Sequence, residues 1–197
     1  MKKLNDLYPG IGTDLIIRNI RNNSLEVEKN DLFVCTIDSN LDRHNCIEEA
    51  IRNGACAIVV SRDIHDPRVA VIKVPDTNRE FPYLCQKFYD FPDKKMGMIG
   101  VLGTDGKTST SIIIQSLLGI NKTGYIGTNG RSCAAFNDED KDKVLDASKL
   151  YEGLGEFVKF GCKYAVVEVS SREILQKSLI ASNYDVLVFT NLANEYL

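Results

Sequence analysis

The sequence has little of what several common classes of protein require. It contains only two histidines, and none of its six cysteines forms a C-x-x-C pair, so we do not expect a structural zinc site. Lysine and arginine number 24 against 27 aspartates and glutamates, which argues against a nucleic-acid partner. No run of about 18 apolar residues could span a membrane, and MKKLNDLYPGIGTDL lacks the apolar core of a signal peptide. We therefore expect a cytoplasmic protein with reduced thiols.

The first half of the chain alternates predicted strands and helices. Three apolar, mostly β-branched runs are typical of buried strands: 31–37, 55–60 and 69–74. Residues 45–54 have the apolar spacing of a helix that stops at Gly54. Residues 77–90 predict another helix, whose start Pro82 could delay. The polar, proline-bearing stretch DFPDKK that follows predicts a domain boundary, with one domain over 1–92 and a second over 97–197.

The second half predicts an α/β domain with a parallel sheet. A strand runs into a glycine loop over 96–103, and the remaining predicted elements are helices at 107–119 and 148–161 and strands at 123–128, 163–170 and 184–191. The last two strands are almost continuously apolar, as strands covered by helices on both faces are. The charge cluster at 137–143 predicts a solvated loop.

The glycine loop GVLGTDGKTST (100–110) has the residues of a phosphate-binding site. Gly103 and Gly106 allow close approach and positive φ, and the start of the next helix offers free N–H groups and a positive dipole end. Lys107 supplies a charge for phosphates and Thr108 a hydroxyl for Mg²⁺. Val101 stands where the usual spacing has glycine. An ordinary glycine turn before a helix is the alternative.

Glu168 lies at the end of the predicted strand KYAVVEV. Ligands of open α/β sheets bind at the carboxyl ends of strands, so Glu168 is expected on the same edge as the glycine loop. Its carboxylate could hold Mg²⁺ there. A solvated glutamate at a strand end explains the same position equally well.

Several motifs, in this order, resemble the Mur ligases: GVLGTDGKTST, VVEVSSREIL and VFTNLANEYL. The N-terminal segments EVEKNDLFVC, DRHNCIEEAIRNGACAIVV and VIKVPDTNREFPYLCQKFYDFPDKKMGMIGV look like the UDP-N-acetylmuramoyl-tripeptide synthetase branch. The resemblance implies a small N-terminal α/β uridine-binding domain, followed by a truncated P-loop-type parallel-sheet domain that binds ATP. It covers nearly the whole chain, and the C-terminal ligase domain is expected to be absent.

The resemblance also implies an activity. Mur ligases form amides in peptidoglycan synthesis: a UDP-N-acetylmuramoyl peptide carboxylate takes the γ-phosphate of ATP, and the amine of an amino acid then attacks the acyl phosphate. ATP and Mg²⁺ are the implied cofactors. Carried over by position, the nucleotide contacts are Gly103, Thr104, Asp105, Gly106, Lys107, Thr108 and Ser109; the catalytic residues are Lys107 and Glu168; the metal ligands are Thr108 and Glu168; and the substrate contacts are Ser24, Ser39, Asn40 and Ser171.

The sequence departs from the family pattern at several of these places. Asp105 replaces the usual asparagine, and its carboxylate is unfavourable beside phosphates. A Thr-Thr-Pro motif expected near 143–145 reads KVL. Arg172 and Tyr196 stand where histidines are expected, and Ser178 replaces a substrate-binding arginine. Ser39 and Asn40 differ in type from the usual uridine-site residues.

Three readings remain open from the sequence. The chain is part of a ligase that is active when complete, or it is a degenerate paralogue that binds ATP or a UDP-sugar without ligating, or it is a P-loop kinase or GTPase-like switch. The sequence gives the kinase or GTPase reading little support, because it shows no guanine-reading motif and no strand-end aspartate of the usual second nucleotide motif. We expect no ligation by residues 1–197 alone. A sheet ending after Phe189 would expose an edge to a protein partner or a second copy.

Overall fold

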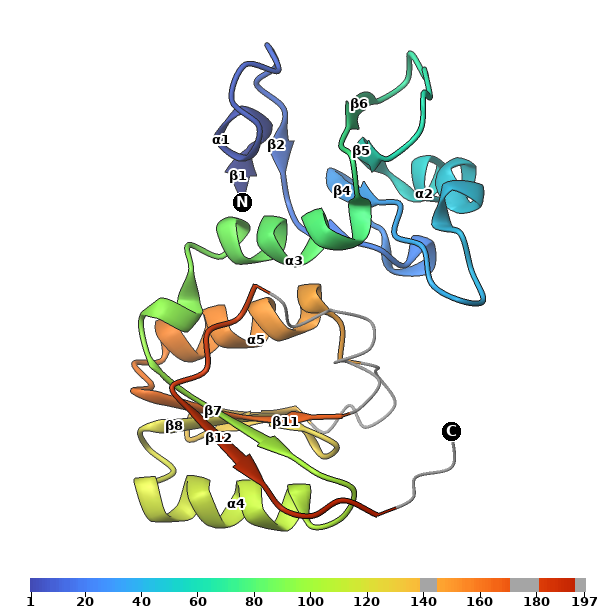
Figure 1. Cartoon of the computed structure of the whole chain (residues 1–197). Helices are drawn as coiled ribbons and strands as arrows, with labels where there is room; N and C mark the ends of the chain where they lie inside the picture. Colours follow the sequence, from blue (N-terminus) through green and yellow to red (C-terminus); the bar gives the residue numbers. More distant parts are fainter. Residues whose placement is uncertain (139–144, 171–180, 194–197) are drawn as a thin grey trace. The chain divides into compact units, whose positions relative to one another are not determined.

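The computed structural model describes residues 1–138, 145–170 and 181–193 (Figure 1). The chain divides into two compact units, Met1–Phe88 and Tyr89–Leu197. Each unit has its own sheet of mainly parallel strands with helices packed against it. The α/β class expected from the sequence is confirmed.

The first unit is built on a four-stranded sheet with every neighbouring pair parallel. The strands follow each other in the order β3 (Ile20–Arg21), β4 (Asp31–Val34), β5 (Ala55–Val60) and β6 (Ala70–Lys73). A separate antiparallel pair joins β1 (Lys2–Lys3) to β2 (Ile16–Ile17), with the four-residue helix α1 (Leu4–Leu7) between them. The three strands expected from the sequence are confirmed, whereas β1, β2 and β3 were not expected.

Short helical segments link β3 to β4 and β4 to β5: η1 (Ser24–Glu26), η2 (Arg43–Cys46) and α2 (Ile47–Asn53). The longer helix α3 (Thr77–Phe88) follows β6. Helix α2 ends as predicted at Gly54, whose φ of 116° suits glycine and whose N–H donates to the carbonyls of Ala50 and Ile51. A side chain at position 54 would bring its Cβ within 2.7 Å of Lys29 Cα. Glycine is therefore required both by the turn and by this close approach.

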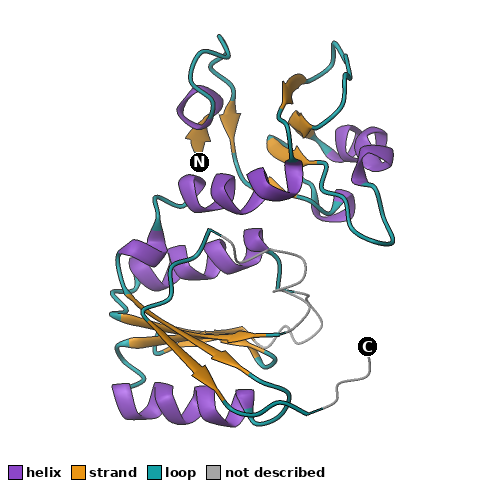
Figure 2. Cartoon of the chain, viewed as in Figure 1, coloured by secondary structure: helices purple, strands orange, loops and turns teal. Residues whose placement is uncertain are grey.

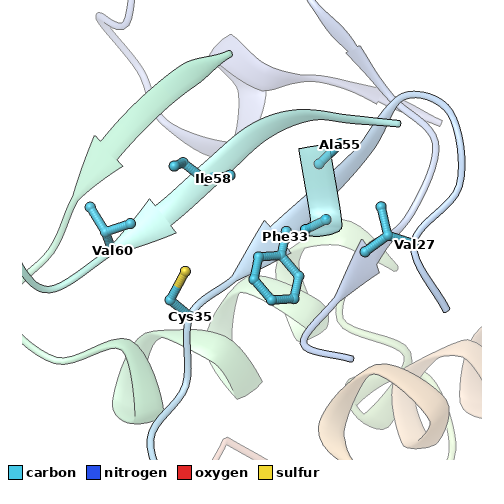
Figure 3. Packing of buried hydrophobic residues seen from close by; sticks show 7 residues of the cluster. Val27, Phe33, Cys35, Ala55, Ile58 and Val60 are labelled. Atoms are coloured by element: carbon cyan, nitrogen blue, oxygen red, sulfur yellow. The ribbon is translucent and has the colours of Figure 1, made fainter. Parts of the chain in front are cut away.

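The core of the first unit lies where α2 and the loop before β4 pack on one face of the sheet. Phe33 of β4 and Cys35, which directly follows β4, belong to one cluster with Ile58 and Val60 of β5 (Figure 3). These side chains have no more than a few per cent of their surface exposed. The alternate, inward-facing residues of two adjacent strands thus form the buried layer.

The expectation that Pro82 delays the start of α3 is wrong. The helix begins at Thr77 and contains Pro82 in its interior. Asp76 Oδ1 accepts from the N–H groups of Asn78 and Arg79 at 2.9 and 3.1 Å, which caps the first turn. The side chain of Asn78 also bonds the backbone of Ile37 in both directions. These contacts hold the turn that precedes the proline.

Asp76→Ala should lower the free energy of unfolding of the first unit by about 1 kcal/mol, the usual loss for a helix cap. Urea denaturation followed by circular dichroism measures this change. Amide hydrogen exchange at Asn78 and Arg79 should accelerate at the same time. Asp14→Ala is the control: Asp14 makes only an exposed ion pair with Lys3 at 3.3 Å, which should contribute about 0.5 kcal/mol or less. Equal effects of the two substitutions would contradict the capping role.

The second unit contains a six-stranded sheet in the order β10-β9-β8-β11-β7-β12. Its strands are β7 (Gly97–Leu102), β8 (Thr123–Gly127), β9 (Gly130–Cys133), β10 (Phe136–Asp138), β11 (Tyr164–Val169) and β12 (Val186–Phe189). Neighbours among β8, β11, β7 and β12 are parallel, and β9 and β10 extend the sheet as antiparallel strands. The parallel sheet expected from the apolar runs is confirmed.

Two long helices sandwich this sheet. Helix α4 (Lys107–Leu118) covers one face and α5 (Ala147–Lys159) the other, as Figure 2 shows. The short η3 (Pro92–Lys94) packs beside α5. Gly124 on β8 lets α5 approach closely, because a Cβ there would lie 2.3 Å from the ring of Phe157. Both helices fall within about two residues of their expected bounds.

The predicted solvated loop at 137–143 is partly wrong. Residues 136–138 form β10, which pairs with β9, while 139–144 lie outside the described residues. Arg131 on β9 bonds Asp138 at 2.9 Å, so one charge of the cluster supports the hairpin.

At the opposite lateral edge of the sheet, β12 pairs only with β7 among the described strands, and Leu187 and Phe189 are more than 60% exposed. Association at this edge stays a prediction.

Within the described ranges, no helix is both long and apolar enough to cross a membrane. All six cysteines are free thiols, four of them buried.

Candidate functional site

The candidate site lies where the parallel strands of the second unit end. The glycine loop follows β7, Thr128 follows β8, Glu168 is the last residue but one of β11, and Thr190 follows β12. Because these strands are parallel, their carboxyl ends share one edge of the sheet. The topology therefore brings together residues that are far apart in the sequence, such as Gly103 and Thr190, which are 87 positions apart.

The loop from Gly103 to Gly106 has positive φ at both ends, a conformation that favours glycine. Gly103 has φ 137°, and a Cβ there would lie 2.0 Å from Thr190 Oγ1. Gly106 has φ 78° and precedes α4 without a side-chain cap. The first N–H of α4 bonded within the helix is that of Thr110, which donates to Gly106 O at 2.9 Å. The N–H groups of the first turn are thus left for an anion.

Lys107 reaches back over the loop. Its Nζ donates to the carbonyls of Gly103 and Thr104 at 2.7 and 2.8 Å. The ammonium group therefore sits directly above the loop, at the start of α4, where its charge adds to that of the helix dipole. A phosphate held by the loop would meet a cation already in place.

Glu168 is the buried centre of the site, with 5% of its surface exposed. Its Oε2 accepts from Thr108 Oγ1 at 3.0 Å and from Thr128 Oγ1 at 2.8 Å, and its Oε1 accepts from the phenol of Tyr125. Gly127 makes room for the carboxylate, since a Cβ there would lie 2.5 Å from Glu168 Cδ. The glutamate is therefore held in a defined pose, unlike a freely solvated side chain.

Tyr125 fixes one oxygen of this carboxylate. Burial raises the pKa of the Tyr125 phenol, and the hydrogen bond to Glu168 raises it further. The phenol therefore remains protonated at neutral pH and donates to Oε1. Oε2 is then the oxygen that faces the two threonine hydroxyls.

The oxygens of Thr108 and Glu168 fit a hard cation such as Mg²⁺. They are 3.0 Å apart, and a hydroxyl with one carboxylate is a usual protein contribution when phosphates and water supply the other ligands. No group of three or more His, Cys, Asp or Glu side chains suited to a metal occurs in the described part of the chain. A metal held by protein groups alone is therefore not indicated there.

Two of the other predicted loop residues, Thr104 and Asp105, bond the segment that follows β12. Asp105 and Ser109 are exposed at the mouth of the loop. The Asp105 N–H donates to Asn191 Oδ1 at 2.9 Å, and its carbonyl accepts from Asn191 Nδ2 and Thr190 Oγ1. Thr104 Oγ1 accepts from the N–H of Ala193 at 3.0 Å. The segment after β12 thus binds the loop, which the sequence interpretation missed.

The predicted substrate contacts of the first unit lie after β3 and β4, whose carboxyl ends share one edge. Ser24 is buried, and its hydroxyl donates to Glu49 of α2. Ser39 and Asn40 are exposed in a turn where Asp38 Oδ1 accepts from the Asn40 N–H at 2.9 Å. The structure therefore gives Ser24 a bonding role within the unit and leaves the other two at the surface.

The remaining predicted positions lie outside the described residues: Ser171, Arg172, Ser178 and Tyr196.

A parallel sheet with a glycine loop leading into a helix, and a carboxylate at the neighbouring strand end, is an arrangement typical of α/β proteins that bind phosphates. Comparison with known proteins makes this more specific. Residues 101–197 match the family model of the Mur ligase middle domain. Residues 101–197 thus belong to the Mur ligase family, and the relatives that align with 92% or more of the whole chain are Mur ligases of the tripeptide-synthetase type.

Two curated relatives illustrate the match. UDP-N-acetylmuramyl-tripeptide synthetase 2 of Oceanobacillus iheyensis is 35% identical over 190 residues, covering 92% of this chain and 38% of that protein. UDP-N-acetylmuramoyl-L-alanyl-D-glutamate--2,6-diaminopimelate ligase 2 of Clostridium acetobutylicum is 33% identical over 216 residues, covering 99% and 43%. The chain spans about two fifths of the length of these relatives.

Solved structures support the fold. A UDP-N-acetylmuramoyl-L-alanyl-D-glutamate--2,6-diaminopimelate ligase aligns with a TM-score of 0.75 at 23% identity, over 100% of this chain and 41% of that one. The MurF ligase of Thermotoga maritima, solved in complex with ADP, aligns with a TM-score of 0.55 at 26% identity, over 91% and 38%.

Proposed function

We propose that the second unit binds ATP together with Mg²⁺. The observation that carries this proposal is the hydrogen bond between Thr108 and Glu168, which joins the first turn of α4 to the end of β11. It sets a hydroxyl and a carboxylate beside the loop that Lys107 covers. In this arrangement the loop and Lys107 hold the phosphates, while Thr108 and Glu168 hold the cation.

We also propose that the first unit contributes to binding a UDP-N-acetylmuramoyl peptide, with Ser24, Ser39 and Asn40 near the uridine. The exposed turn of Ser39 and Asn40 beside the carboxyl end of β4 supports this assignment. Ser171 is assigned to the same substrate by family position. The reaction served is the cytoplasmic formation of an amide between that peptide and an amino acid, through an acyl phosphate.

Within this reaction, the groups of the second unit act on charge and position. Lys107 and the free N–H groups of α4 neutralise and orient the transferred phosphoryl group, which is the main demand of phosphoryl transfer. Glu168 and Thr108 would hold Mg²⁺, which would neutralise charge on the phosphate oxygens. The amino-acid site is assigned to the part of the relatives that this chain does not match, so we expect binding without ligation by these 197 residues.

The test is a calorimetric titration of the whole chain with adenosine, ADP and a non-hydrolysable ATP analogue, each with and without Mg²⁺. Binding that strengthens with the number of phosphates, and that for the ATP analogue strengthens with Mg²⁺, is the expected result. Binding of adenosine as tight as that of the ATP analogue would overturn the phosphate assignment. GTP binding in preference to ATP would point to a switch protein instead.

The second candidate is a nucleotide-binding paralogue that does not ligate in any assembly. The substitutions Arg172, Ser178 and Tyr196 at chemistry positions favour it. Incubation with ATP, Mg²⁺, a UDP-N-acetylmuramoyl dipeptide and the candidate amino acids, with the downstream part of a homologous ligase added in trans, separates the two. Amide formation would exclude the paralogue.

A further inference from the structure

The segment after β12 is bound to the phosphate loop by contacts that the proposed nucleotide site does not by itself explain. Two backbone hydrogen bonds join the segments: the Thr190 N–H donates to Leu102 O at 2.9 Å, and the Thr104 N–H donates to Asn191 O at 3.2 Å. Thr104 Oγ1 then accepts from the Ala193 N–H at 3.0 Å. The loop and the segment 190–193 therefore form one hydrogen-bonded unit.

Asn191 has a special place in this unit because its carboxamide bonds both polar groups of one residue. Its Oδ1 accepts from the Asp105 N–H at 2.9 Å, and its Nδ2 donates to the Asp105 carbonyl at 3.1 Å. The two bonds fix the peptide groups on either side of Asp105 at once. Asp105 immediately precedes Gly106, the residue from which α4 starts.

We infer that Asn191 is a positioning residue for nucleotide binding: it holds the Asp105 backbone so that the free N–H groups of Gly106 and the first turn of α4 converge on one phosphate. This inference rests on the proposed nucleotide site. Pre-ordering the loop lowers the conformational cost of binding. It also directs the Asp105 N–H away from the ligand, so that the phosphate is left to the groups from Gly106 onward.

Thr190 supports the same contact more weakly. Its single hydroxyl proton faces two carbonyls, those of Asp105 at 2.7 Å and Leu102 at 3.2 Å, and can be given to only one at a time. The Asp105 N–H donates to Asn191 and not to this hydroxyl. Asn191 is therefore the side chain that controls both polar groups.

The experiment compares four variants with the unmodified chain: Asn191→Leu, which keeps the branched shape of the side chain in a larger volume and loses both bonds; Asn191→Asp, which keeps only the acceptor; Thr190→Val; and the control Leu192→Ala. Leu192 is 84% exposed and one residue away. Affinity for the Mg²⁺ complex of the ATP analogue is measured by calorimetry. Hydrogen exchange of the Asp105 N–H is measured without ligand, with the N–H groups of β8 as an internal reference.

We expect Asn191→Leu to weaken binding about tenfold, from the loss of two hydrogen bonds of roughly ordinary strength, and to expose the Asp105 N–H to exchange. Asn191→Asp should keep that N–H protected yet bind more weakly, because its second carboxylate oxygen repels the Asp105 carbonyl to which Nδ2 donates in the unmodified chain. Thr190→Val should weaken binding about threefold or less. Leu192→Ala should change neither measurement. Unchanged β8 exchange shows that the fold is kept.

The outcomes separate the inference from the proposed function. If the unmodified chain binds the nucleotide and Asn191→Leu has an affinity within a factor of about two of it, the inference alone is overturned. A role of Asn191 in packing only predicts that result. An Asp105 N–H that exchanges as fast in the unmodified chain as in Asn191→Leu would also overturn it. No binding of the nucleotide by the unmodified chain would overturn the proposed function, and the inference with it.

Discussion

Lys107→Ala is expected to bind the Mg²⁺ complex of a non-hydrolysable ATP analogue at least about 30-fold more weakly than the unmodified chain, a loss of about 2 kcal/mol. Two effects add in this variant. The charge that meets the phosphates is removed, and hydrogen bonds to charged groups are the stronger kind. The carbonyls of Gly103 and Thr104 also lose the partner that Nζ provides at 2.7 and 2.8 Å. Calorimetric titration measures the affinity.

Two companion variants make this result specific. Lys122→Ala removes an exposed lysine just before β8, at the amino ends of the parallel strands and so away from the loop. It should leave the affinity for the ATP analogue unchanged. Lys107→Arg keeps the charge on a wider planar group and should recover only part of the binding, since the loop is matched to a compact ammonium. Full binding by Lys107→Ala would mean that the loop is an ordinary glycine turn, the alternative left open by the sequence.

The sequence predicted the elements whose signal is local. Six-residue apolar runs such as 55–60 and 164–169 contain enough β-branched residues to be identified alone, and Gly54 marks the end of its helix by its backbone conformation. The β9–β10 hairpin was missed because GRSC is short and polar. It exists through pairing with β8 and through the bond of Arg131 to Asp138. Such strands depend on neighbours that no local pattern reveals.

The start of α3 shows how a local rule can be overridden. Proline disfavours a helix interior because it lacks a donor and crowds the preceding turn. In this chain Asp76 caps the turn and Asn78 bonds Ile37, 41 residues away. Asp76, directly before the helix, was the available signal, since aspartate is a preferred cap.

For the site, the rule that ligands bind at the carboxyl ends of parallel strands was enough to place Glu168 beside Thr108. It could not identify which residues hold the carboxylate or the loop. Tyr125 and Thr128 reach Glu168 because β8 lies next to β11, and Asn191 reaches Asp105 because β12 lies next to β7. That strand order is a property of the folded sheet. The polar residues that follow β8 and β12 were the available sequence signal for Thr128 and Asn191, whereas Tyr125 lies within β8.

Glu168→Gln tests the metal assignment, because its expected effect on the affinity for the ATP analogue depends on whether Mg²⁺ is present. With Mg²⁺ present, the variant should bind the ATP analogue at least about tenfold more weakly, because one ligand and one negative charge are lost from the cation site. Without Mg²⁺ it should bind as tightly as the unmodified chain or more tightly, since a carboxylate near phosphates repels them. Apparent affinity is measured against Mg²⁺ concentration for both proteins.

Tyr125→Phe is the matched control for this experiment. It removes the phenol that bonds Glu168 Oε1 and leaves the carboxylate and its bonds to Thr108 and Thr128 in place. Its affinity should fall by a smaller factor and should keep the Mg²⁺ dependence of the unmodified chain. If Glu168→Gln also keeps that dependence, the buried carboxylate acts only as an acceptor that ties β8 and α4 to β11. The cation would then have to be held by the phosphates and Thr108 alone.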